Sequence, residues 1–358
     1  MKQQAKHILR KAREVRSPVC VTITMNTHRT RPDSLQDPIR LKGLLKQTEV
    51  RLNKEHGPKL AKSIMDKLHV LADGIDHAHN KDGLVLFASE GFSDKVRLPI
   101  PVIERITVDA AFATRDLFRA LHHETEYYVL LLNRSQARLF HAFNGKVEAE
   151  ITDGFPMANN VAGADAVRQL GDREPEVVQE FFNRVDKALV QVINAQPLPV
   201  VLASERRNVD HYRTVADKQE FLKAEFKPSR EDLTPLHLVE EAWEVFAPMV
   251  KERYASQVNA LDRAVSAGRL FSDHNDIWRA LETGKGGTLF VKQGLFQPAL
   301  LTDAGITLLP EEKREKAVAL DDVIDEMIDR NLAIGGDAVF VSGPELDRFN
   351  GLALVARY

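Results

Sequence analysis

Two arginine-rich stretches have the residue types and spacing to bind phosphate groups. In the first, Arg206 and Arg207 directly follow PVVLASE, a continuous apolar run that predicts a buried strand. Ligands of α/β folds commonly bind where such strands end, and guanidinium groups pair with phosphate oxygens. Arg213 is a further candidate in this stretch. The alternative role for these arginines is ion pairing with Glu205 and Asp210.

The second arginine-rich stretch follows the predicted strand in SPVCVTITMNT, near the N-terminus. His28, Arg29 and Arg31 come directly after this strand, and Arg40 lies within the helix predicted next. We predict that these four residues form an RNA-facing patch, because RNA is held largely through its phosphates.

Two further stretches contain residue types that occur in ligand-binding sites. The segment DGIDHAHNKDG contains Asp76, His77 and His79, residue types that bind metals. Its Gly, Asp and Asn content instead predicts a solvated turn. The segment GKGGT lacks the spacing of a phosphate-binding loop and precedes a strand, so nucleotide binding is not expected. Its Lys285 contacts either RNA or no ligand. We predict no metal and no cofactor.

The composition is that of a globular protein without a membrane span. The chain has 358 residues, a formal net charge of −3 and one cysteine, Cys20, which cannot form an intrachain disulfide. No apolar run approaches the roughly 20 residues of a membrane-spanning helix, and no secretory signal is evident. We therefore expect a cytoplasmic protein. Residues 1–31 carry eight Lys or Arg and one acid, whereas residues 300–350 carry twelve acids and five bases. A basic arm of this kind suits a polyanionic partner, and a solvated helix face is the alternative.

The order of predicted elements divides the chain into three α/β blocks. Block one, residues 1–123, has a strand, helices beginning near Asp37 and Pro58, and the strand GLVLFAS. Block two, residues 124–218, has a three-strand meander (127–132, 137–143, 146–151), an irregular segment at 153–174, a helix and the strand PVVLASE.

Block three, residues 228–358, follows the charged stretch KQEFLKAEFKPSRED, which we interpret as a linker. A long helix begins at Pro235, and Pro248 is expected to kink it. A second helix at Asn275–Leu281 precedes the strand GGTLFVKQG. A third helix around Met327 and the strands AVFVSG and LALVARY complete the block.

This succession resembles the bacterial branch of the archaeo-eukaryotic peptide-chain release factor family, relatives of class-1 release factors and Pelota. The family's middle domain opens with a meander similar to YYVLLLNRSQARLFHAFNGKV. Its later strand and the polar turn after that strand are similar to PLPVVLASERRNVDHYRTV. The family's third domain is similar to HLVEEAWEVFAPMVKERY and DIWRALETGKGGTLFVKQG. The first domain of the bacterial branch is similar to VCVTITMNTHRTRPDSLQDPIRLKGLLKQ. The resemblance implies three α/β domains. The middle one would be a ribonuclease H-like mixed sheet, and the last an α/β/α sandwich like the ribosomal proteins that bind kink-turn RNA.

In the family, a Gly-Gly-Gln loop between the middle domain's sheet and its helix positions water at the ester bond of peptidyl-tRNA. The equivalent segment here, DGFPMANNVAGADAVRQLGDREP, has isolated glycines and one glutamine, Gln169, beside Arg168. Gly-Gly-Gln occurs nowhere in the chain. Gln169 is either a divergent catalytic substitute, which would make the protein a peptidyl-tRNA hydrolase, or an ordinary polar loop residue. Arg168 is a candidate RNA contact.

The resemblance therefore implies a ribosome-associated translation factor that acts in rescue, stalling response or recycling, without an intact Gly-Gly-Gln centre. Its partners would be the ribosome with tRNA and rRNA, and a translational GTPase is compatible with the resemblance. The alternative is a stress-associated adaptor that binds RNA or protein away from the ribosome.

Overall fold

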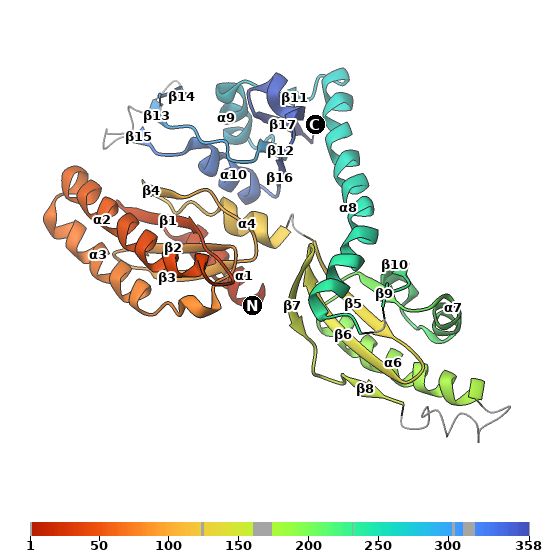
Figure 1. The fold of residues 1–358 in the computed structure, drawn as a ribbon. Helices are drawn as coiled ribbons and strands as arrows, with labels where there is room; N and C mark the ends of the chain where they lie inside the picture. The colour runs from red at the N-terminus through yellow and green to blue at the C-terminus, as the bar shows by residue number, and fades with distance from the viewer. Residues whose placement is uncertain are drawn as a thin grey trace. The chain divides into compact units, whose positions relative to one another are not determined.

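The structure is a computed structural model of the full chain, drawn in Figure 1. It describes residues 2–122, 125–159, 174–230, 232–302, 305–310 and 319–357. Contacts divide the chain into two compact units. Unit 1 comprises Met1–His123 and Val258–Tyr358, and unit 2 comprises Glu124–Gln257. The predicted α/β class is confirmed, and the boundaries of the three predicted domains remain a prediction.

The first part of unit 1 is an antiparallel sheet of four strands in the order β3-β2-β1-β4. The strands are β1 (Cys20–Asn26), β2 (Gly83–Ser89), β3 (Ser93–Leu98) and β4 (Arg105–Asp109). Helices α2 (Asp37–His56) and α3 (Pro58–Asp73) cover one face. Val21, Ile23 and Met25 alternate along β1 toward these helices, where they pack against leucines such as Leu41 and Leu45.

Three elements of this part were not predicted: α1 (Lys2–Glu14), β4, and α4 (Arg115–His122). Ile8, Leu9 and Ala12 of α1 are buried, and α1 contacts both α4 and β3. The basic N-terminus is therefore a helix docked on its domain. This helix was not predicted, because its apolar face was overlooked among its many charges.

The second part of unit 1 is a sheet of four strands in the order β11-β17-β12-β16, with a small sheet beside it. The main strands are β11 (Leu270–Phe271), β12 (Gly287–Lys292), β16 (Asp337–Val341) and β17 (Leu352–Ala356). The helices are α9 (His274–Glu282) and α10 (Val323–Ala333). The small sheet, which was not predicted, consists of β13 (Ala299–Thr302), β14 (Gly305–Leu308) and β15 (Ala319–Leu320).

Unit 2 is built on a mixed sheet of six strands in the order β10-β9-β5-β6-β7, with β8 paired to β6. The meander is β5 (Glu126–Leu132), β6 (Gln136–Phe143) and β7 (Lys146–Glu150), as predicted. The other strands are β8 (Met157–Ala158), β9 (Val200–Ala203) and β10 (Leu222–Phe226). Strands β10, β9 and β5 run parallel, whereas β5, β6 and β7 are antiparallel. The predicted mixed sheet is confirmed.

Helices cover both faces of this sheet. Helices α6 (Glu174–Ala195) and α7 (Arg206–Val215) pack on the face that presents Tyr128 and Leu130. The N-terminal half of α8 (Pro235–Ser266) packs on the opposite face against Tyr127 and Phe140. Helix α8 continues past Pro248, which lies inside it. Both faces of β5 are therefore buried, which explains its nearly continuous apolar sequence.

Two predictions about unit 2 were wrong. The stretch interpreted as a charged linker contains β10, whose alternating Leu222, Ala224 and Phe226 pack against the two cores of the unit. The polar turn expected after β9 is the helix α7. In both β10 and α7, charged residues exposed to solvent alternate with buried apolar residues and obscured the apolar repeat.

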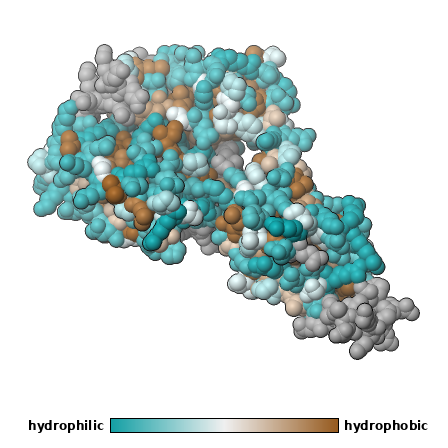
Figure 2. Space-filling model, viewed as in Figure 1, coloured by the Kyte–Doolittle hydropathy of each residue, from teal (hydrophilic) through white to brown (hydrophobic). Residues whose placement is uncertain are grey.

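The surface carries scattered hydrophobic residues. On the face shown in Figure 2, hydrophobic residues (brown) are interspersed among hydrophilic ones (teal). The most exposed large hydrophobic residues include Ile39, Val50 and Val70, on α2 and α3. Among the helices that the structure describes, none combines the length and the apolar character needed to cross a bilayer.

Candidate functional site at the carboxyl edge of the parallel strands

The carboxyl ends of β5, β9 and β10 meet at one edge of the sheet of unit 2. Ser204, directly after β9, connects the three strands. Its amide donates to the carbonyl of Phe226 at 2.9 Å, and its Oγ donates to the carbonyl of Leu132 at 2.5 Å. The ends of parallel strands are where ligands commonly bind α/β sheets.

Residues 157–159, within the segment predicted to be irregular, lie at this same edge. Asn159 donates its amide to Ser135 O at 2.7 Å and its Nδ2 to Arg134 O at 3.0 Å, in the turn between β5 and β6. Phe155 is buried in the core beneath α6. Residues 153–159, expected to be irregular, are therefore fixed to the sheet through β8. Gln169 and Arg168 lie outside the described residues.

The predicted phosphate-binding arginines lie on α7, with Arg206 and Arg207 at its start, beside this edge, and Arg213 in its last turn. Arg206 pairs with Asp210 at 3.2 Å and with Glu225 at 2.7 Å. Arg213 pairs with the other oxygen of Glu225 at 2.8 Å. The ion-pairing alternative thus describes Arg206 in part, although Glu225 of β10 is a partner that was not anticipated. Because these groups are largely exposed, the pairs contribute little stability and leave the arginines accessible.

Arg207 differs from its neighbour. It is exposed, and it has no ion-pair partner among the residues that the structure describes. The expected partner Glu205 instead pairs with Lys227 at 3.2 Å. The edge therefore presents guanidinium groups that can bind an anion through charge and hydrogen bonds.

A buried carboxylate fixes α7 in this position. Asp186 of α6 accepts a hydrogen bond from Tyr212 Oη at 2.9 Å and one from the amide of Asp217 at 3.1 Å. Burial raises the pKa of the Asp186 carboxyl. These bonds attach α6 to Tyr212 within α7 and to Asp217 just after α7. The carboxylate therefore has a structural role.

The predicted patch of the first block is mostly engaged in pairs within its own domain. The ring Nδ1 of His28 lies 2.8 Å from Asp37 Oδ1. Arg29 pairs with Asp82 at 2.8 Å, and Arg40 pairs with Glu104 at 2.6 Å. A fourth cation, Arg31, is exposed and forms no ion pair within the described ranges. Of this patch, Arg31 has the most freely available charge.

The glycines around Lys285 serve packing. A Cβ on Gly286 would lie 2.5 Å from Ile334 Cδ1, and one on Gly287 would lie 2.0 Å from the carbonyl oxygen of Val355. Buried Asn331 bonds both backbone groups of Gly287 at 3.0 Å. The loop is thus shaped by its neighbours, and the Lys285 side chain is exposed beside it.

The His-rich segment of the first block forms a short 3-10 turn, His77–His79, as predicted. Asp76 accepts the amide of Ala78 at 3.0 Å and lies 2.6 Å from the Nδ1 of His79. The hydrogen bond with His79 lowers the pKa of Asp76. Across the described part of the chain, no three His, Cys, Asp or Glu side chains are arranged to hold a metal ion.

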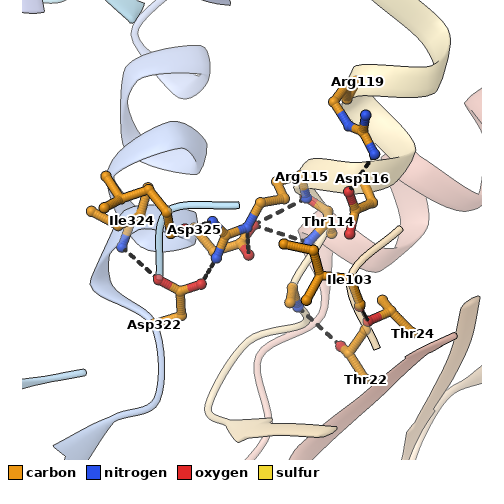
Figure 3. Close-up of polar contacts among 12 residues, drawn as sticks. Thr22, Thr24, Ile103, Thr114, Arg115, Asp116, Arg119, Asp322, Ile324 and Asp325 are labelled. Carbon is orange, nitrogen blue, oxygen red and sulfur yellow. Dashed lines mark hydrogen bonds and ion pairs between the residues drawn. The ribbon is translucent and has the colours of Figure 1, made fainter. Parts of the chain in front are cut away.

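Sequence reasoning missed a polar network that joins the two parts of unit 1 (Figure 3). Arg115, at the start of α4, pairs with Asp325 of α10 at 2.8 Å and also with Asp322. Arg119 donates to the carbonyl of Pro101 at 2.6 Å. The partners are about 200 residues apart in sequence, and no local pattern relates them.

A cavity of about 180 Å³ lies beside this network. Its lining includes the cations Arg105, Arg115, Arg119 and Lys292. Arg115 and Arg119 are paired with carboxylates, Lys292 pairs with Asp347, and Arg105 lies over the ring of Phe296. Three of these four cations are thus paired with carboxylates of the protein, and the network has a structural role.

Comparison with known proteins shows which family the region of the site is similar to. Residues 126–285, which include the strands and arginines of the candidate site, match the family model described as bacterial archaeo-eukaryotic release factor family 3. The chain matches none of the curated proteins.

Solved structures that align with the chain include three translation proteins. Archaeal translation termination factor aRF1 is 16% identical, with 100% of this chain and 98% of that chain covered and a TM-score of 0.26. Ribosome-bound archaeal Pelota, in a structure with ABCE1, is 14% identical, with 100% and 94% covered and a TM-score of 0.45. Dom34 of S. cerevisiae is 15% identical, with 77% and 73% covered and a TM-score of 0.37. Over residues 126–285, the chain is therefore similar to bacterial archaeo-eukaryotic release factor family 3.

Proposed function

We propose that the protein is a ribosome-associated translation factor that acts in rescue, stalling response or recycling, without a Gly-Gly-Gln hydrolytic centre. One observation carries the proposal. The family match covers the whole sheet of unit 2 and its carboxyl edge, yet Gly-Gly-Gln does not occur among the 358 residues. A factor that keeps the domain and lacks the triplet would bind the ribosome without releasing the peptide.

The carboxyl edge of unit 2 supports this proposal through its chemistry. Arg206, Arg207 and Arg213 are exposed on α7, and Asn159 is hydrogen-bonded to Arg134 at the same edge. An edge of this composition would bind RNA phosphates. The proposed partners are the ribosome with its tRNA and rRNA, in the cytoplasm, and a translational GTPase would be a delivery partner.

The proposal is tested by co-sedimentation of the purified protein with ribosomes at increasing salt concentration. We expect binding that weakens steeply with salt, because phosphate contacts release counterions. Arg207→Gln should weaken binding and reduce the salt slope by about 1. Lys187→Gln, an equally exposed cation on α6, is the matched control and should behave as wild type.

The other candidate, an adaptor that acts away from the ribosome, predicts a different result. Exposed hydrophobic side chains such as Ile39 and Val70 would suit a protein partner, although hydrophobic residues are scattered on the face in Figure 2. Absence of co-sedimentation at low salt would contradict the ribosomal proposal and favour this adaptor.

A further inference from the structure

An open groove runs along α1 in unit 1, separate from the candidate site of unit 2. Its volume is about 470 Å³. We call it the α1 groove, and its lining consists of Lys6, Leu9, Arg10, Arg13, Glu14, Arg16, Asp329 and Ala333. Lys6, Arg10 and Arg13 are spaced by four and three residues, so their side chains leave the same side of the helix.

The helix that carries these cations is held firmly. Ile8 and Ala12 of α1 are buried against the domain, with exposed fractions of 1% and 0%. Arg13 bonds Asp329 of α10 twice, with Nε 3.0 Å from Oδ1 and a terminal nitrogen 3.1 Å from the carbonyl oxygen. The charges are therefore presented on a fixed element, which reduces the entropy lost when a ligand binds.

The cations of the α1 groove are only partly neutralised. Arg13 is paired with Asp329, and Arg16 donates to the carbonyls of Arg13 and Val15, which carry no net charge. Lys6 and Arg10 are exposed and have no ion pair with any described residue. Glu14 is the remaining acid of the lining. The groove thus keeps a surplus of positive charge in a domain whose other arginines are mostly paired.

We infer that the α1 groove binds the phosphate backbone of RNA without reading its sequence, an inference that rests on the proposed function. The cations from Lys6 to Arg13 span about 10 Å at 1.5 Å per residue, room for a few phosphates. The lining contains no aromatic side chain on which a base would stack. The α1 groove would therefore bind RNA through charge and not through recognition of bases.

An acidic protein is the other class of anion, and the composition of the surface disfavours it. Protein interfaces bury an apolar centre within a polar rim. The large exposed hydrophobic residues of the described chain begin at Leu35, and none lies on α1. Leu9 of the groove is itself buried. The exposed face of α1 therefore lacks the apolar centre that a protein partner would cover.

The test measures binding of the full chain to a labelled 20-nucleotide oligouridylate by fluorescence anisotropy over a salt series. The double variant Lys6→Gln, Arg10→Gln removes the two unpaired cations and keeps residues of high helix propensity. The matched control is Lys59→Gln, Lys62→Gln, which removes two exposed cations from α3. Circular dichroism confirms that each variant keeps its fold.

We expect the double variant to bind about tenfold more weakly and to lower the salt slope by about 1.4, because each phosphate contact contributes about 0.7 for a single strand. The control should match wild type. An unchanged affinity and slope in the double variant would overturn the inference. Polyglutamate that binds as tightly as RNA at equal charge would overturn it in favour of an acidic protein.

Co-sedimentation with ribosomes separates this inference from the proposed function. If wild type fails to bind ribosomes but its RNA binding depends on Lys6 and Arg10, the proposed function fails and the α1 groove stands. If ribosomes are bound equally by wild type and by the double variant, and RNA binding is also unchanged, the groove inference fails alone.

Discussion

Asp325 both caps the helix that begins at Arg115 and pairs with the side chain of that residue. Its Oδ1 accepts the amide of Arg115 at 3.0 Å, while its Oδ2 accepts Nε of Arg115 at 2.8 Å (Figure 3). The amide of Thr114 also donates to Oδ1, at 3.2 Å. One carboxylate of α10 thus satisfies the N-terminus of α4 and a nearly buried guanidinium, and it joins the two parts of unit 1.

We expect Asp325→Ala to lower the free energy of unfolding of unit 1 by about 3 kcal/mol, because it leaves two helix amides and the Nε of a nearly buried guanidinium without their acceptor. Urea unfolding followed by Trp278 fluorescence, in a Trp243→Phe background, measures this. The control is Asp347→Ala, which removes an exposed partner of Lys292 and should cost less than about 1 kcal/mol. Equal losses in both variants would contradict a capping role.

The stability of unit 1 should fall as the pH rises from about 4 to about 7. Burial raises the pKa of Asp109 to about 7 and that of Asp329 to about 6. Asp321 and Glu326 raise the pKa of Asp109 further. The folded state therefore binds more protons than the unfolded state in this range, and deprotonation disfavours folding.

Urea unfolding at several pH values between 4 and 8, again followed by Trp278, measures this dependence. Asp109→Asn removes one titrating group and should flatten the decline, most clearly between pH 5 and 7. Parallel curves for wild type and variant would show that Asp109 does not titrate in this range.

In unit 2, Tyr127→Phe should lower the free energy of unfolding by about 1 kcal/mol. Tyr127 is fully buried, and its hydroxyl donates to the carbonyl of Asn144 at 2.6 Å. Its ring stacks on Trp243 of α8, with a centroid distance of 5.9 Å, so Trp243 fluorescence in a Trp278→Phe background reports unfolding of this unit. The control is Tyr128→Phe, whose hydroxyl bond is longer, 3.4 Å to Gln196 O, and should cost less. A larger loss in the control would contradict the assignment.

We expect no release of peptide from ribosome complexes that carry labelled peptidyl-tRNA, because the sequence lacks Gly-Gly-Gln. Gln169→Ala should leave this background unchanged, and a Gly-Gly-Gln release factor is the positive control. Release by wild type that disappears in Gln169→Ala would instead establish a divergent hydrolase centred on Gln169.

Much of the secondary structure could be read from local patterns. The meander of β5, β6 and β7 follows from apolar runs separated by turn residues, and α2 and α3 follow from helical spacing behind Asp37 and Pro58. Elements with charged solvent faces, such as α1 and β10, were missed because their buried sides are short. Local patterns are informative only when enough apolar residues repeat within one element.

The sequence by itself determined which chemistry was available: clustered arginines after β9, a basic N-terminus and no Gly-Gly-Gln. Only the tertiary structure decided which charges are neutralised. Arg206 and Arg213 share Glu225 because β10 pairs with β9, and Arg115 meets Asp325 across about 210 residues of chain. An ion pair depends on distances of a few ångströms in space, and the packing of distant elements sets those distances. For the same reason, only the structure distinguished Lys6 and Arg10, which keep their charge free, from Arg13, which does not.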